Sequence, residues 1–113
     1  MSVRETLESL FAAWRGGDAL RAAAHFSADG AYREAHGEPV VGRDALIAFF
    51  TRFFRDGPRW ELFVDDVLVD GDRAAVRYRF AVHAAAGSRR ERHGCALVVV
   101  SDGAILEWRE YEG

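Results

Sequence analysis

The sequence has one cysteine and no long apolar run, and each shortage excludes a class of protein. Cys95 has no second cysteine with which to form an internal disulfide, which agrees with a reducing compartment. The apolar runs extend over only a few residues, whereas a membrane-spanning helix needs about 20, so no membrane partner is expected. The first residues lack the apolar segment of a signal peptide, and we therefore expect a cytoplasmic protein.

Charge and size set further limits. Fifteen basic residues, all of them arginine, oppose eighteen acidic residues, and the net charge of −3 gives no general attraction to nucleic acid. The arginine bias and the nineteen alanines indicate a GC-rich, bacterial genome. Half of the 113 residues are hydrophobic, so we expect one domain over residues 1–113 that buries a single core.

Three helices are predicted in the first half of the chain. Ser2 and Glu5 have the spacing of a capping box, and apolar residues at helical spacing follow until Gly16. A shorter helix is predicted over about 18–26, where the first residue is an aspartate that favours the N-cap position. The third helix, over about 44–55, carries four closely spaced phenylalanines, which is typical of a helix that lies between other layers.

The remaining segments are predicted to be strands. A turn at 27–30 precedes a strand over 31–35, and a brief return strand is possible at 40–41. Apolar and polar residues then alternate with a period of two, in strands over about 60–69, 73–85, 90–100 and 104–111. The order of elements predicts an α+β fold, in which a curved antiparallel sheet wraps around the helices.

Four short motifs carry a resemblance that extends over essentially the whole chain. They are Gly17-Asp18, Phe26-Ser27-Ala28-Asp29, Gly42-Arg43-Asp44 and Trp108-Arg109-Glu110-Tyr111. The sequence thereby resembles the SnoaL-like branch of the nuclear transport factor 2-like superfamily. The resemblance implies a cone-shaped α+β barrel with a pocket at its open end. It does not imply one activity, because this fold hosts isomerases, hydrolases, cyclases, dehydratases and non-catalytic modules.

The resemblance to ketosteroid isomerases within this superfamily is incomplete. Their catalytic aspartate base matches Glu34, and a carboxylate in an apolar cone is a suitable base. Their two oxyanion donors match Leu10 and a position near Cys95 or Ala96, none of which replaces the missing donor group. Each missing donor removes on the order of 3 kcal/mol of transition-state stabilisation. We therefore do not expect a standard ketosteroid isomerase.

Limonene epoxide hydrolases end in a similar motif and need two aspartates bridged by an arginine. In this chain Glu110 takes the place of the last aspartate and Arg77 that of the arginine. The other aspartate falls on Arg79, which cannot help to deprotonate water in that way. The resemblance therefore does not imply a standard limonene epoxide hydrolase either.

Three polar residues, Tyr32, Glu34 and His36, alternate along the first predicted strand, so that all three could project into the cone. In one interpretation Glu34 is a general base, His36 orients or assists it, and Tyr32 donates a hydrogen bond. In the other, His36 lies at the exposed strand end and Glu34 pairs with an arginine for structural reasons.

Ligand-binding residues are expected among the aromatic side chains of the cone, namely Trp14, Phe50, Trp60 and Trp108. Glu110 shares a strand face with Trp108, and it either recognises a ligand or forms an ion pair with Arg77. The alternation along 73–85 conflicts with that ion pair, because its apolar face leaves Arg77 on the opposite side of the strand. Both placements stay open at this point.

No cofactor and no metal ion are expected. The chain has no glycine-rich phosphate loop, and His83, His93 and Cys95 lack the spacing of a metal site. The expected partner is a small hydrophobic molecule. Two functions stay open: a cofactor-independent acid–base enzyme of isomerase, cyclase, dehydratase or hydrolase type, and a non-catalytic ligand-binding or dimerisation module.

The last two strands carry apolar residues on both faces. In the strand over 90–100, for example, Ala96 and Val98 alternate with Leu97 and Val99. A strand of this kind has both faces buried, and three helices cover only one face of the sheet. We therefore expect a homodimer through the outer faces of these strands, with an interface on the order of 1,200–2,000 Å².

Overall fold

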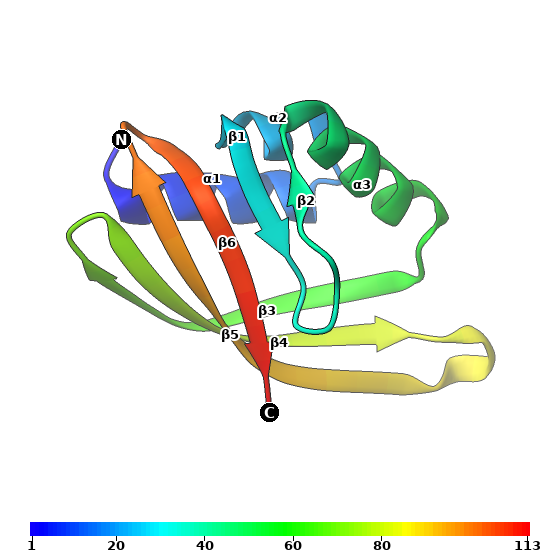
Figure 1. Ribbon diagram of the computed structural model, residues 1–113. Coiled ribbons are helices and arrows are strands. Elements are labelled where there is room, and N and C mark those ends of the chain that lie inside the picture. Colours follow the sequence, from blue (N-terminus) through cyan, green and yellow to red (C-terminus); the bar gives the residue numbers. More distant parts are fainter.

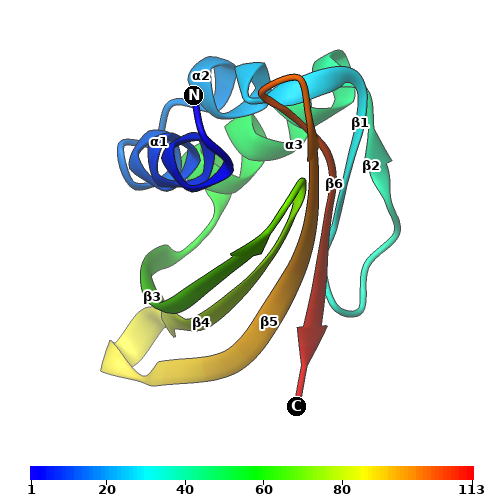
Figure 2. The same ribbon diagram turned by 90° about the vertical axis from the view of Figure 1, so that its left-hand side faces the viewer.

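Three helices and six strands form two layers in the computed structural model, which describes all 113 residues (Figure 1). The helices α1 (Val3–Arg15), α2 (Ala19–Ala24) and α3 (Arg43–Asp56) lie on the concave side of one curved sheet (Figure 2). The strands are β1 (Phe26–Arg33), β2 (Val40–Val41), β3 (Arg59–Asp70), β4 (Arg73–His83), β5 (Arg89–Ser101) and β6 (Ala104–Glu112). The 3₁₀ turn η1 (Ala85–Gly87) joins β4 to β5. This arrangement confirms the α+β fold.

The predicted helix caps are present. Ser2 Oγ accepts a hydrogen bond from the Glu5 amide at 3.1 Å, and the Ser2 amide donates to Glu5 Oε1 at 3.0 Å. Asp18 Oδ1 likewise accepts a hydrogen bond from the Arg21 amide at 3.0 Å. These contacts satisfy amides that have no partner within their own helix. The second helix is shorter than expected, because it ends at Ala24.

Strand β1 is longer than the sequence indicates. The segment 27–30 has the composition of a turn, yet it forms an irregular part of a strand that begins at Phe26. The reason lies far along the chain, because β6 runs beside β1 and the Ile105 amide donates a hydrogen bond to the His25 carbonyl at 2.8 Å. Gly30 permits this approach, since a Cβ there would lie 2.7 Å from the Ile105 carbonyl oxygen.

The sheet is mixed rather than wholly antiparallel. Its strand order is β2-β1-β6-β5-β4-β3, and only the pair of β1 and β6 is parallel. The four long strands follow one another through short turns and are antiparallel, as their alternation predicts. The pairing of β1 with β6 joins the first and last strands, which no local pattern reveals.

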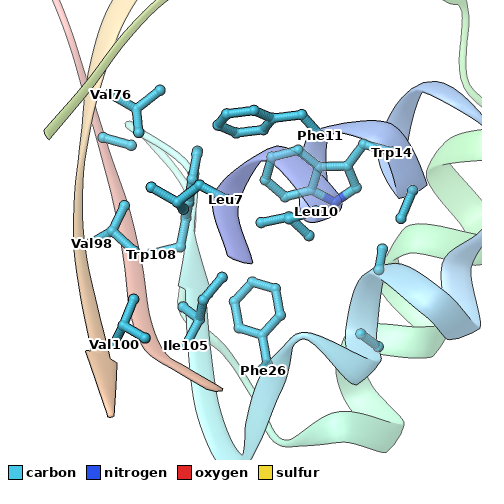
Figure 3. Close-up of a cluster of buried hydrophobic side chains, with 14 of the residues drawn as sticks. Leu7, Leu10, Phe11, Trp14, Phe26, Val76, Val98, Val100, Ile105 and Trp108 are labelled. Atoms are coloured by element: carbon cyan, nitrogen blue, oxygen red, sulfur yellow. The ribbon is translucent and has the colours of Figure 1, made fainter. Parts of the chain in front are cut away.

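The core lies between α1 and the inner face of the sheet. Figure 3 shows side chains from α1 directed at residues of β1, β4, β5 and β6, among them Leu7, Leu10, Phe26, Val98 and Ile105. These five side chains are almost fully buried and hold α1 across the sheet. The cone is consequently filled at this end. None of the three helices has the length and apolar character needed to span a membrane.

Candidate functional site

A cavity of about 60 Å³ remains at the other end of the cone, between α1, α3 and the inner face of the sheet. Eighteen residues line it, and eleven of them are aromatic. Seven of the eight residues predicted to form the site are among them: Trp14, Tyr32, Glu34, Phe50, Trp60, Trp108 and Glu110. The eighth, His36, does not line the cavity.

Aromatic rings from four different elements, α1, α3, β1 and β6, meet at one wall of the cavity. Trp14 of α1 packs edge to face on Trp108 of β6, with ring centroids 5.0 Å apart. Phe50 of α3 makes similar contacts with Trp14 at 6.0 Å and with Tyr32 at 5.4 Å. Trp60 of β3 stacks on Phe54 and Phe80, with ring centroids 6.1 Å and 5.6 Å apart. The fold therefore brings together rings that lie far apart in the sequence, and it presents their faces and edges to one small space.

Glu110 is held at this wall by two donors. Its Oε2 atom accepts hydrogen bonds from Trp108 Nε1 at 2.9 Å and from Tyr32 Oη at 3.2 Å. Burial raises the pKa of Glu110 above its ordinary value, the charges of Glu34 and Glu112 add to this effect, and the two hydrogen bonds oppose it. The cavity thus contains a carboxyl group that holds its proton more tightly than a carboxyl group in water.

Two tyrosines flank this carboxyl group. Burial, followed by the negative charge of Glu110, raises the pKa of both Tyr32 and Tyr78, so both hydroxyls stay protonated. Tyr78 Oη is buried without a hydrogen-bond partner. Its ring lies over Gly94 on the neighbouring strand, where a Cβ would come within 2.5 Å of Tyr78 Oη. Glycine at this position therefore makes room for the tyrosine.

Glu34 follows directly after the end of β1 and is half-buried at the cavity. His36 lies in the turn beyond it, is exposed, and makes no hydrogen bond with Glu34. The strand ends before position 34, so the expected alternation of Glu34 and His36 on one strand face does not apply. An ion pair of Glu34 with an arginine is not found either, since all eight ion pairs of the structure involve other groups.

Arg77 is on the outer face of β4, and the proposed ion pair with Glu110 is wrong. The Arg77 guanidinium contacts the Asp66 carboxylate across the β3–β4 pair and is largely exposed. The reason is the alternation of the strand, which directs its apolar face inward. Tyr78 on that inner face lines the cavity.

The site also contains two charged residues that the sequence analysis does not identify. Arg92 of β5 and Glu112 of β6 line the cavity and lie 3.8 Å apart. The period of two could have identified Glu112, because it places this residue on the same face as Glu110.

Histidine side chains form ion pairs with carboxylates outside the cavity, as His83 does with Glu61 at 2.7 Å. No group of three or more metal-ligating side chains is assembled.

Comparison with known proteins assigns the family. The model of the SnoaL-like domain matches residues 7–108, which is nearly the entire chain. The chain belongs to the SnoaL-like domain family. No protein of curated function matches its sequence.

Solved structures with the same fold cover almost the full length of this SnoaL-like domain. A nuclear transport factor 2-like protein of unknown function from Burkholderia pseudomallei has a TM-score of 0.87 at 18% identity, over 100% of this chain and 92% of its own. A protein with a ketosteroid isomerase-like fold from Catenulispora acidiphila, in complex with trimethylamine, has a TM-score of 0.84 at 19% identity, over 97% and 86%. A limonene epoxide hydrolase-like epoxide hydrolase from M. tuberculosis has a TM-score of 0.83 at 19% identity, over 96% and 80%.

This SnoaL-like domain has no polar group at either position expected for an oxyanion donor of ketosteroid isomerases. Leu10 is fully buried in the hydrophobic core. Ala96 is also fully buried, and Cys95 is paired with Arg77 and Tyr111, which places it on the outer side of the sheet. The polar groups that do face the cavity come instead from β1 and the residue after it, Glu34, and from β4, β5 and β6.

Proposed function

We propose that this SnoaL-like domain binds a small molecule in the aromatic cavity and carries out acid–base chemistry on it without a cofactor, with Glu34 as the general base. The observation that supports this proposal is the presence of two carboxyl groups, Glu34 and Glu110, in one aromatic enclosure. A carboxylate that lies within reach of a bound ligand can accept a proton from it. Two such groups in different surroundings can divide the roles of base and acid.

The two carboxyl groups differ in their partners. Glu110 receives hydrogen bonds from Tyr32 and Trp108, and because burial raises its pKa, it suits the role of the acid, which gives a proton to the ligand and takes one back. Glu34 receives no hydrogen bond from another side chain and is free to take a proton from the ligand. In an isomerase-type reaction, the proton that Glu34 removes from one carbon returns to another, so Glu34 ends the cycle ionised. Tyr32 would position Glu110 in this scheme.

The size of the cavity limits the ligand. A volume of about 60 Å³ accommodates a few water molecules, and hence a compact molecule of few non-hydrogen atoms. A larger metabolite requires the aromatic side chains to move or must extend out of the cavity. The relative from Catenulispora acidiphila was solved in complex with trimethylamine, and a molecule of that size suits this cavity.

A non-catalytic ligand-binding module is the second candidate. It is favoured by the absence of polar groups at the positions of the two oxyanion donors, where Leu10 and Ala96 are buried. The aromatic cavity and its carboxyl groups then serve recognition alone. The two candidates agree on the location of the ligand and differ only in whether Glu34 transfers a proton.

A thermal-shift screen of small apolar metabolites, followed by assays of the hits for turnover, separates the candidates. Glu34→Gln preserves the shape of the side chain and removes its basicity, so it should lower kcat by roughly 10²- to 10⁴-fold with an unchanged melting temperature. Glu38→Gln is the matched control, because Glu38 lies four residues further on, is exposed, and does not line the cavity. Full activity of Glu34→Gln would refute the role of Glu34. Bound ligands that are never turned over would favour the second candidate.

A further inference from the structure

The charges that line the cavity do not balance. Three carboxyl groups, Glu34, Glu110 and Glu112, face it together with a single basic residue, Arg92. The Arg92 guanidinium lies 3.8 Å from the Glu112 carboxylate, so the charge of Arg92 is paired with that of Glu112. None of the eight ion pairs in the structure includes Glu34 or Glu110. Two carboxyl groups in the cavity are therefore without a positive partner.

For Glu110, the lack of a positively charged partner raises the free energy of the ionised carboxylate. The donors to its carboxylate, Tyr32 and Trp108, are neutral, and its surroundings are aromatic. A carboxylate that is removed from water needs a counter-charge, and without one it takes up a proton more readily. A cation placed beside Glu110 would remove this cost. The protein itself supplies no such cation.

The walls of the cavity suit a cation as well. Trp14, Tyr32 and Phe50 meet nearly at right angles, with interplanar angles of 72° to 78°. The rings of Trp14 and Trp108, from α1 and β6, also meet nearly at right angles, with an interplanar angle of 87°. The face of an aromatic ring carries partial negative charge, and rings in several orientations form the cage that recognises alkylated ammonium groups.

We propose that the ligand of this cavity carries a compact alkylated ammonium group, bound by the aromatic rings and by the carboxylates of Glu34 and Glu110. This inference rests on the proposed function, because it assumes that the cavity binds a small molecule. Alkyl groups on the nitrogen match the apolar walls, and the positive charge matches the two unpaired carboxylates. An unsubstituted ammonium or guanidinium group would also place N–H donors against the aromatic walls, which have no acceptor atom for them, and an anion would be repelled.

Choline and 3,3-dimethylbutan-1-ol provide a matched pair of probes, because they have the same shape and differ in the charge of one atom. Binding of each is measured by isothermal titration calorimetry and by the fluorescence of the three tryptophans, Trp14, Trp60 and Trp108, all of which line the cavity. We expect choline to bind about tenfold or more tightly than its neutral analogue. Equal affinities, or tighter binding of the neutral analogue, would overturn the inference and leave the cavity as the binding site for a neutral molecule.

Variants test the role of the carboxylates. Glu110→Gln and Glu34→Gln should each weaken choline binding by about tenfold and leave the binding of 3,3-dimethylbutan-1-ol unchanged. Glu107→Gln is the control, because Glu107 is an exposed residue of the same strand β6 that does not line the cavity. Circular dichroism melts establish that each variant is folded, and either carboxylate variant alone suffices if the other unfolds. Unchanged choline affinity in a folded variant would overturn the inference.

The failures of the two proposals are distinguishable. If choline does not bind but the thermal-shift screen finds neutral ligands, the ammonium inference is wrong and the proposed function stands. If neither choline, nor its analogue, nor any compound of the screen binds, both proposals are wrong.

Discussion

The same substitution at two tyrosines of the cavity should change stability in opposite directions. Tyr32 Oη donates a hydrogen bond to Glu110 Oε2 at 3.2 Å, and Tyr32→Phe removes that bond. Tyr78 lines the same cavity, and only 4% of this residue is exposed. Its Oη atom is buried and has no hydrogen-bond partner. Tyr78→Phe therefore removes a hydroxyl group that lost its hydration on folding and forms no hydrogen bond within the structure.

The magnitudes follow from the kind of contact. A hydrogen bond to a charged acceptor contributes about 1.5–3 kcal/mol, and the length of the Tyr32 bond places it at the low end, so Tyr32→Phe should destabilise by about 1–2 kcal/mol. An unsatisfied buried hydroxyl costs about 1–3 kcal/mol, so Tyr78→Phe should stabilise the fold by about 1 kcal/mol. The two variants should therefore differ by about 2–3 kcal/mol in their free energy of unfolding.

Urea unfolding of both variants and the wild type at pH 7 measures this difference. Equal m-values establish that the substitutions change stability and not the denatured state. For a domain of this size, the two melting temperatures should be separated by roughly 10 °C. If both variants are destabilised to the same extent, Tyr78 Oη forms a hydrogen bond with Glu110 in solution, and the account of an unsatisfied hydroxyl is wrong.

Two further predictions concern charge and assembly. Because the pKa of Glu110 is raised in the folded state, the stability that its proton contributes is fully present below the pKa of the unfolded chain and is lost as the pH rises through the folded pKa. Glu110→Gln does not titrate, so urea unfolding should show its stability relative to the wild type increasing between pH 4 and pH 7, and a constant difference would contradict this. We also propose that two copies pair through the outer face of the sheet, where Leu97 and Tyr111 are 50% and 47% exposed. Light scattering should then show a dimer that Leu97→Arg dissociates, whereas a wild-type particle of 12.6 kDa at micromolar concentration would refute the pairing.

The sequence by itself determined the parts of this protein that depend on neighbouring residues. The capping box of Ser2 and Glu5 and the cap at Asp18 are local contacts, and they were predictable for that reason. The four antiparallel strands from β3 to β6 follow from a period of two and from short turns, each of which needs only a few residues. The resemblance to the SnoaL-like family added the cone, and with it seven of the eighteen residues that line the cavity.

Only the tertiary structure decided how these residues combine. The parallel pairing of β1 with β6 places Tyr32 opposite Trp108, and this register brings the Tyr32 hydroxyl to Glu110 from 78 positions away. The same structure leaves His36 in an exposed turn and Arg77 on the outer face of its strand. A strand pattern has two faces and no information about its partner, so it cannot specify which carboxylate meets which donor. That choice depends on which strands pair and on which side the helices cover, and both are properties of the whole chain.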